Sequence, residues 1–173
     1  MCGIVGYVGE KQAANFLIDG LTKLEYRGYD SAGIAVFDGE KINVAKSVGR
    51  LAALKEKIKN NTPEGVMGIG HTRWATHGRP SDVNSHPHTD CSGKFAIVHN
   101  GIIENFMSLK EELIAKGHKF VSETDTEVVA HLIEDVYEGD FVEAVNKVLN
   151  RIEGSYSLAF MCQDYPDTLI CTK

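Results

Sequence analysis

The first nine residues, 1–9 (MCGIVGYVG), place a cysteine directly behind the initiator methionine. The apolar run over 3–8 predicts a short strand. A buried strand does not need a thiol at its first residue, although Cys2 packing as a small apolar side chain is the alternative. We therefore expect that this strand opens the fold and presents Cys2 for chemistry at the N-terminus.

Removal of Met1 would give Cys2 a free α-amine next to its own thiol. The small residues Cys2 and Gly3 are of the kind that permit this removal. An α-amine titrates near ~7.7–8.0, below the ~8.5 of a free thiol, so it can accept the thiol proton near neutral pH. Nucleophile and general base would then occupy one residue. Cys2 is accordingly our candidate nucleophile.

Length and composition restrict the class of protein. The chain has 173 residues and a formal net charge of −6, which predicts one domain and argues against nucleic acid or an anionic membrane as partner. No apolar run approaches the roughly 18 residues of a membrane span, and no secretory signal is visible. The four cysteines follow neither a zinc motif nor a disulfide framework. We expect a cytoplasmic protein with free thiols.

The rest of the chain alternates between helical and strand periods without strict strand–helix alternation, which predicts an α+β layering. Asp38-Gly39 predicts a hairpin, and Thr124 with Glu127 predicts a capping box. The chain stops inside a strand region, so we expect further chain beyond residue 173. Helices are expected at 14–24, 51–58, 106–113, 128–136 and 141–152, and strands at 32–36, 42–45, 66–71, 95–99, 155–162 and 169–171.

Residues 71–78 (HTRWATHG) follow a strand and have neither a helical nor a strand period. Arg73 offers a planar fork of donors that suits a carboxylate. Thr76 and His77 add hydrogen-bonding groups beside it, and Trp74 is costly in an irregular loop. A surface loop with a structural arginine explains the stretch about equally well at this point.

Asn100-Gly101 has two interpretations. The dipeptide alone favours a hairpin turn, because Asn-Gly between apolar runs is the strongest short-range hairpin signal. The alternative is an oxyanion hole, in which the Asn100 amide and the Gly101 backbone N–H approach a reacting carbonyl.

Asp125 lies in 122–127 (SETDTE), which opens a predicted helix. A first-turn carboxylate complements the helix macrodipole, and by itself this structural interpretation is favoured. The functional alternative is that Asp125 receives the ammonium group of a ligand.

Five of the seven histidines lie between residues 71 and 99, which raises the question of a metal. Their spacing contains no His-Glu-x-x-His, and Pro87 separates His86 from His88 in an extended loop. We therefore expect no metal and no cofactor here, and interpret His71, His77, His86, His88 and His99 mainly as hydrogen-bonded structural groups.

These features together select a ligand. A thiolate and an oxyanion hole act on an acyl carbon, an arginine holds a carboxylate, and an aspartate holds an ammonium group. An amino acid with a side-chain amide has all three groups, namely an acyl carbon, a carboxylate and an ammonium group. L-Glutamine is the natural candidate.

Six stretches carry a family resemblance: MCGIVGYVG, LEYRGYDSAGIA, GHTRWATHG, NSHPH, VHNGIIEN and SETDTE. In order and spacing they resemble the glutaminase domain of the class II, N-terminal-nucleophile glutamine amidotransferases over essentially all 173 residues. RGYDSAG and HTRWATHG resemble the hexosamine branch better than the amidophosphoribosyltransferase branch. The resemblance implies an αββα sandwich of the N-terminal-nucleophile hydrolase type.

The resemblance also implies residue roles. Cys2 is the implied nucleophile, and Asn100 with Gly101 the implied oxyanion hole. The implied glutamine-binding residues are Arg73, Thr76 and His77 for the α-carboxylate, Asp125 for the α-ammonium group and Trp74 for the loop that covers the site. Arg27 is the implied neighbour behind the thiol.

The implied activity is hydrolysis of L-glutamine to glutamate and ammonia through a Cys2 thioester, an aminotransferase half-reaction. The ammonia is destined for fructose 6-phosphate in making glucosamine 6-phosphate. On this interpretation residues 1–173 form a glutaminase domain that is incomplete at its C-terminal end, lacks the sugar-phosphate isomerase domain, and forms a homodimer through missing domains. The alternatives are the glutaminase half of an amidophosphoribosyltransferase-like enzyme, or a non-catalytic glutamine-binding fragment if Met1 is retained.

Overall fold

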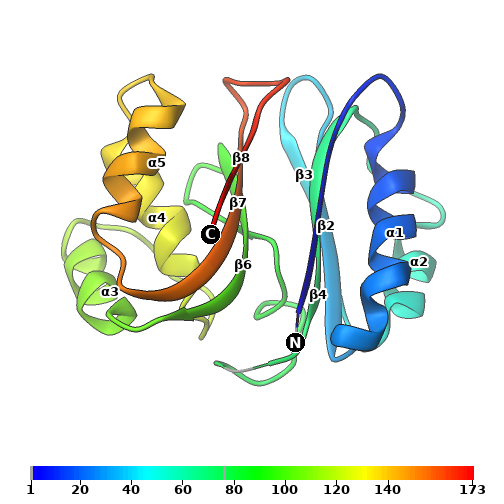
Figure 1. Ribbon diagram of the computed structural model, residues 1–173, viewed down its shortest axis with the longest axis horizontal. Helices are drawn as coiled ribbons and strands as arrows, with labels where there is room; N and C mark the ends of the chain where they lie inside the picture. Colours follow the sequence, from blue (N-terminus) through cyan, green and yellow to red (C-terminus); the bar gives the residue numbers. More distant parts are fainter. Residues whose placement is uncertain (1, 76) are drawn as a thin grey trace.

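The computed structural model describes residues 2–75 and 77–173 and consists of four layers (Figure 1). Two four-stranded antiparallel sheets pack face to face, and helices cover the outer face of each sheet. The strand orders are β1-β4-β2-β3 and β5-β6-β7-β8. The predicted αββα sandwich is therefore confirmed. Within the described residues, no helix is long and apolar enough to cross a membrane.

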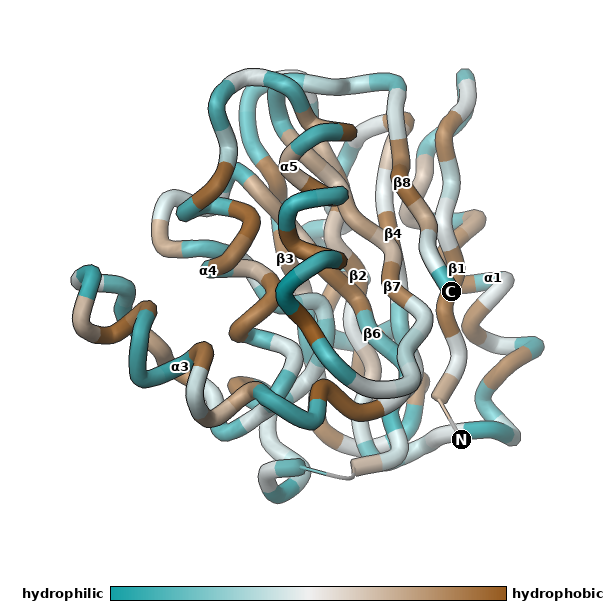
Figure 2. The backbone as a smooth tube through the Cα atoms, turned by 60° about the vertical axis from the view of Figure 1, so that its left-hand side comes forward, coloured by the Kyte–Doolittle hydropathy of each residue, from teal (hydrophilic) through white to brown (hydrophobic). Residues whose placement is uncertain are grey.

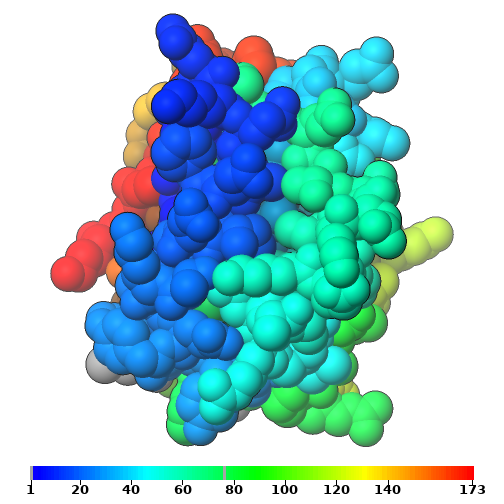
Figure 3. Space-filling view, turned by 90° about the vertical axis from the view of Figure 1, so that its right-hand side faces the viewer, coloured from blue at the N-terminus to red at the C-terminus, as the bar shows by residue number. Residues whose placement is uncertain are grey.

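The first sheet is covered by two helices, seen from outside in Figure 3. Leu17 and Leu21 of α1 are fully buried and pack in one cluster with Ile34 and Val36 of β2. Gly28, after the short helix η1, ends this helical segment. The elements are β1 Gly3–Val8, α1 Ala13–Leu24, η1 Glu25–Arg27, β2 Ser31–Phe37, β3 Ile42–Val48, α2 Leu51–Ile58 and β4 Met67–Arg73.

The second sheet is covered by three helices with a separate core, in which Phe95 and Phe160 of the sheet contact helix residues such as Val129 and Phe141. The spacing of apolar residues in the sequence predicted all three of these helices and every strand of this sheet except β5. The elements are β5 His88–Thr89, β6 Phe95–Ile103, α3 Phe106–Ala115, α4 Glu127–Val136, α5 Phe141–Leu149, β7 Gly154–Cys162 and β8 Leu169–Thr172.

A third, thinner core lies between the sheets. Met67 and Ile69 of β4 pack against Ala96 and Val98 of β6 and Met161 of β7. Strand β4 is buried over its whole length, since it has a sheet on one side and a helix on the other. Figure 2 shows the hydrophobic residues concentrated along these strands and the inner helix faces. This layer fixes the separation of the two sheets.

The hairpin predicted at Asn100-Gly101 is wrong. Strand β6 continues through both residues, and Asn100 pairs with Ser157 of β7. Gly101 has a φ of +124°, and a Cβ atom there would lie 2.1 Å from the carbonyl oxygen of Ser155. The Asn-Gly dipeptide suggested a turn because a local sequence pattern cannot show pairing with β7, which lies more than 50 residues further along the chain.

The predicted capping box is also wrong in its partners. The Glu127 carboxylate reaches back, but it accepts hydrogen bonds from the backbone N–H groups of Val121 (2.8 Å) and Ser122 (2.7 Å). The Thr124 hydroxyl lies 3.0 Å from His88 Nε2 instead. Helix α4 begins at Glu127, so Asp125 precedes the helix and is not in its first turn.

Candidate functional site

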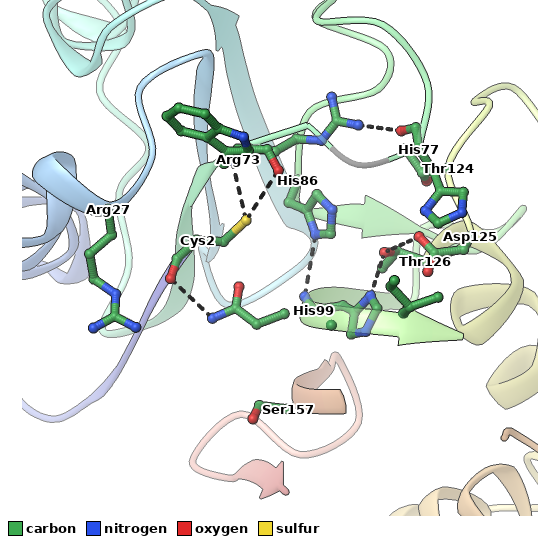
Figure 4. A pocket seen from close by; sticks show the side chains of 14 residues that line it. Cys2, Arg27, Arg73, His77, His86, His99, Thr124, Asp125, Thr126 and Ser157 are labelled. Atoms are coloured by element: carbon green, nitrogen blue, oxygen red, sulfur yellow. Dashed lines mark hydrogen bonds between the residues drawn. The ribbon is translucent and has the colours of Figure 1, made fainter. Parts of the chain in front are cut away.

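One pocket of about 510 Å³ gathers the predicted site residues that the structure describes (Figure 4). It lies where the start of β1, the end of β4, β6 and the segment before α4 come together. Of the predicted residues, only Thr76 lies outside the described residues, as does Met1. The lining residues are Cys2, Arg27, Arg73, Trp74, His77, His86, His99, Asn100, Gly101, Ile102, Thr124, Asp125, Thr126 and Ser157.

Cys2 stands at the head of β1, and its thiol is held by the backbone of Trp74. The Trp74 N–H donates to Cys2 Sγ over 3.2 Å, and Sγ lies 3.6 Å from the Trp74 carbonyl oxygen. Burial raises the pKa of the Cys2 thiol, although the Trp74 hydrogen bond opposes this effect. A thiol of raised pKa is mostly protonated near neutral pH, so a nucleophilic role requires a base.

The Asn100 side chain lies beside Cys2. Asn100 Nδ2 donates to the Cys2 carbonyl oxygen over 3.3 Å, while Oδ1 lies 2.9 Å from His71 Nε2. His71 Nε2 is also 3.0 Å from the His99 carbonyl oxygen, so both its neighbours are acceptors and we assign the proton to Nε2. Burial lowers the pKa of His71 to about 4, which leaves the ring neutral at pH 7. His71 therefore turns the Asn100 amide nitrogen toward Cys2.

Arg73 ends β4 and is buried, with only 3% of its surface exposed. Nη2 donates to the carbonyl oxygens of His77 and Gly78, the latter over 3.1 Å. Nη1 is buried and makes no hydrogen bond within the described residues. A buried donor without a partner is costly. A carboxylate in the pocket would satisfy it, because the fork of a guanidinium suits two oxygens.

Asp125 supplies the opposite charge in the same pocket and is 4% exposed. Its Oδ2 accepts a hydrogen bond from the Ile103 backbone N–H over 2.9 Å. Its Oδ1 lies 3.5 Å from the Thr126 hydroxyl, at the upper limit of a hydrogen bond. One oxygen therefore positions the carboxylate, and the other retains capacity to accept from a ligand.

The segment that carries Trp74 is held by a hydrogen bond and by an aromatic contact. The Asp30 carboxylate accepts a hydrogen bond from the Ala75 N–H, and the Trp74 ring meets Tyr29 edge-on, with centroids 5.3 Å apart. Trp74 remains 48% exposed at the pocket. Gly28 is required beside this segment, since a Cβ atom there would lie 2.8 Å from the Arg73 carbonyl carbon.

His77 contributes differently from expectation, whereas Arg27 lies on the expected side of the pocket. His77 contacts Arg73 through its backbone carbonyl, while its ring lies edge-on to Phe106 with centroids 5.5 Å apart. Its Nδ1 is buried and makes no hydrogen bond within the described part of the chain. Arg27, on η1, lines the pocket on the Cys2 side (Figure 4).

Four buried histidines form a cluster at the pocket, and two of them, His86 and His99, line it. The His71 and His86 rings stack with centroids 4.2 Å apart, and His88 and His99 lie 4.9 and 6.5 Å from His86. Burial lowers the pKa of all four. His99 Nδ1 lies 2.9 Å from the Thr126 hydroxyl. His86, His99 and Thr126 line the pocket without having been predicted as site residues. The density of histidines was the only signal for His86 and His99, and no sequence signal pointed to Thr126.

The comparisons with known proteins agree with this arrangement. A family profile described as "Glutamine amidotransferase domain" matches residues 71–172. The glutamine–fructose-6-phosphate aminotransferase [isomerizing] of Caldanaerobacter subterraneus subsp. tengcongensis is 60% identical over 173 residues, all of this chain and 28% of the relative. The enzyme of the same name from Thermococcus kodakarensis is 56% identical over 175 residues, 100% of this chain and 29% of the relative. The chain thus spans less than a third of the length of these relatives.

Among solved structures, the glutamine phosphoribosylpyrophosphate amidotransferase of B. subtilis, complexed with ADP and GMP, superposes with a TM-score of 0.81. It is 30% identical, and the match covers 94% of this chain and 35% of that one. The profile match, the high identity of the relatives and the shared two-sheet architecture lead to one conclusion: the chain belongs to the glutamine amidotransferase family.

Proposed function

We propose that this chain hydrolyses L-glutamine to glutamate and ammonia. The observation that carries the proposal is that one pocket holds the Cys2 thiol, the Asn100 amide, and two buried opposite charges, Arg73 and Asp125. Both charged groups keep hydrogen-bonding capacity directed to a ligand. A zwitterionic amino acid supplies a carboxylate for Arg73 and an ammonium group for Asp125, and its side chain then reaches the thiol.

In the proposed reaction, the Cys2 thiolate attacks the side-chain amide carbon, and the carbonyl oxygen becomes an oxyanion. Asn100 Nδ2 and the Gly101 backbone N–H are the donors proposed to stabilise this oxyanion. Collapse of the tetrahedral intermediate breaks the C–N bond, and the nitrogen leaves as ammonia after taking up a proton. Water then attacks the thioester, releasing glutamate and regenerating the thiol.

The proposed base is the α-amine of Cys2 after removal of Met1. The thiol pKa is raised by burial, and the Sγ contacts described above are with the backbone of Trp74. An α-amine on the same residue would take the thiol proton and later protonate the leaving nitrogen. Trp74, exposed at the pocket, is proposed to cover the bound substrate.

The test combines intact-mass analysis with a glutaminase assay on one sample. We expect protein lacking Met1 to release glutamate and ammonia, and a diazoketone analogue of glutamine to add once, at Cys2. Absence of both turnover and labelling in mass-confirmed, folded protein without Met1 would reject the proposal. Turnover by protein that retains Met1 would reject the α-amine as base while keeping the reaction.

We further propose that residues 1–173 act as the glutaminase part of a longer enzyme that transfers the ammonia to fructose 6-phosphate. The support is the 60% identity to a relative of that name, of which this chain covers 28%. The alternative acceptor is phosphoribosyl pyrophosphate, favoured by the fold match at 30% identity. Fructose 6-phosphate should stimulate glutamine hydrolysis by the longer protein, and stimulation by phosphoribosyl pyrophosphate instead would select the alternative.

A further inference from the structure

A second cluster of reactive side chains lies away from the pocket, beside the outer helices. Cys91 follows β5, His118 follows α3, and His131 and Glu134 lie on α4. One donor atom from each residue lies within 4.8 Å of all the others. We call these four residues the Cys91 cluster. The residues of the proposed glutaminase chemistry are not among them.

The separations within the Cys91 cluster resemble those of ligands around one ion. Cys91 Sγ lies 3.6 Å from His131 Nδ1, and Glu134 Oε2 lies 3.5 Å from His131 Nδ1 and 2.9 Å from His118 Nδ1. Tetrahedral zinc has bonds of about 2.0–2.3 Å, so its ligand atoms are roughly 3.3–3.7 Å apart. Small side-chain rotations suffice to close the cluster around an ion.

The atoms behind the donors are arranged as they are in metal sites. His131 is 1% exposed, and its Nε2 lies 3.5 Å from Glu127 Oε1 without a hydrogen bond within the described residues. Closing that distance would give the carboxylate–histidine pair that orients a ligating ring. His118 Nε2 lies 3.8 Å from Asp135 Oδ1. The Lys119 backbone N–H donates to Cys91 Sγ over 3.3 Å. Both imidazoles therefore direct Nδ1 into the cluster, and each has a carboxylate near Nε2 that is not yet within a formed hydrogen bond.

We propose that the Cys91 cluster is a zinc site, in which Cys91 Sγ, His118 Nδ1, His131 Nδ1 and Glu134 Oε2 bind one Zn²⁺. An ordinary ion pair accounts for His118 and Glu134, but it does not account for the Cys91 thiol, which lies 3.6 Å from His131 Nδ1, the buried imidazole nitrogen that also faces Glu134 Oε2. The Cys91 backbone N–H donates to the same carboxylate oxygen over 3.2 Å and holds the segment after β5 against α4. A donor set of one sulfur, two nitrogens and one oxygen favours zinc over magnesium or calcium. Binding releases the Cys91 thiol proton.

The site has a structural consequence. It joins the segments after β5 and after α3 to helix α4. Through His131 it also supports Glu127, whose carboxylate holds the backbone of Val121 and Ser122, just ahead of Asp125. Four protein ligands leave no open position, which is typical of a structural metal.

The test measures zinc affinity of the full chain by competition with a chromophoric chelator. All proteins carry Cys2→Ala, because a free N-terminal amine and thiol could chelate zinc on their own. We expect one Zn²⁺ per chain, and a loss of affinity of at least ~10–100-fold in Cys91→Ser and in His118→Gln. Cys171→Ser, which changes another exposed cysteine, is the matched control and should bind as the parent does.

Two further measurements make the test independent of folding failures. Cobalt(II) should give tetrahedral d–d bands with a thiolate charge-transfer band that disappears in Cys91→Ser, and circular dichroism should show both variants folded. Zinc should slow alkylation of Cys91 and leave that of Cys171 unchanged. Binding of less than one equivalent, equal affinity in Cys91→Ser, or tighter binding of magnesium or calcium than of zinc would overturn the proposal.

Discussion

The two ends of the pocket are built differently. At the Cys2 end, the thiol and the Asn100 amide come from strands of opposite sheets, and each is held by hydrogen bonds to Trp74, Cys2 or His71. At the other end, Arg73 and Asp125 border irregular segments, and each keeps capacity to bond. The proposed reacting groups are thus held by hydrogen bonds within the protein, whereas the proposed binding groups keep capacity that a ligand would satisfy.

This contrast predicts different failures. A change at the strand-built end should reduce kcat and leave binding nearly intact, since the groups there meet charge that develops only in the transition state. A change at the loop-built end should mainly weaken kcat/KM, because the lost contact exists in the ground state as well.

The largest effect is expected for Cys2→Ala, which should abolish glutamine hydrolysis because the proposed thioester forms on this thiol. The side chain sits at the head of β1, so the melting temperature should change little. The measurement is ammonia release with a melting curve on the same sample. Residual turnover near the parent rate would remove Cys2 from the mechanism.

A smaller effect is expected for Asn100→Ala, which deletes one proposed oxyanion donor. Loss of such a donor typically lowers kcat by ~10²–10³, with little change in KM. Steady-state kinetics give both values, and Asn146→Ala on the exposed face of α5 is the matched control. If kcat stays at the parental value in a folded Asn100→Ala protein, the Asn100 side chain has no catalytic role and contributes only to the structure of β6.

A lesser loss is expected at the other end. Asp125→Asn keeps the shape but removes a charge from a charge-assisted hydrogen bond worth about 1.5–3 kcal/mol, roughly 10–100-fold in kcat/KM. Arg73→Lys should also be impaired, because a point charge cannot replace the guanidinium fork. An analogue without the α-amine is the control for Asp125→Asn. An equal loss with that analogue would mean that Asp125 does not bind the ammonium group.

The smallest effect concerns stability. His71 has a folded pKa of about 4 against 6.5 for the ordinary group, because it is buried. The unfolded chain therefore binds the proton more tightly. The contribution of neutral His71 to the free energy of unfolding is retained above about pH 6.5 and is lost as the pH falls toward 4. The loss is about 1.4 kcal/mol at one pH unit below 6.5. Burial lowers the pKa of His86, His88 and His99 in the same direction, so melting temperatures should fall between pH 7 and 5 by at least this amount, and a flat profile would contradict the neutral buried histidines.

The elements with a strong local period could be predicted from the sequence. The hairpin at Asp38-Gly39 and helix 51–58 are confirmed, because local spacing determines both. Asn100-Gly101 was the main error in the fold, since the sequence pattern could not show that β7 pairs there. Among the described site residues, all predicted positions line one pocket.

The Cys91 cluster could not have been predicted in the same way. Its four residues come from three separate segments, so no motif spacing joins them. Only the i, i+3 placement of His131 and Glu134 on α4 was visible in the sequence, and that spacing is common on helices without a ligand. Similarly, the role of His71 in orienting Asn100 depends on two sheets meeting, which no single stretch encodes.

The bond between His71 and Asn100 joins the two sheets, and so does the contact of Asn100 with Cys2. The separation of the Cys2 and Asn100 side chains therefore depends on the thickness of the layer formed by Met67, Ala96 and Met161. If Cys2 and Asn100 act as proposed, the side-chain volumes in this layer determine how well the two groups are aligned. We expect that adding or deleting one methyl group in this layer would change the separation of Cys2 and Asn100 although no pocket residue is altered.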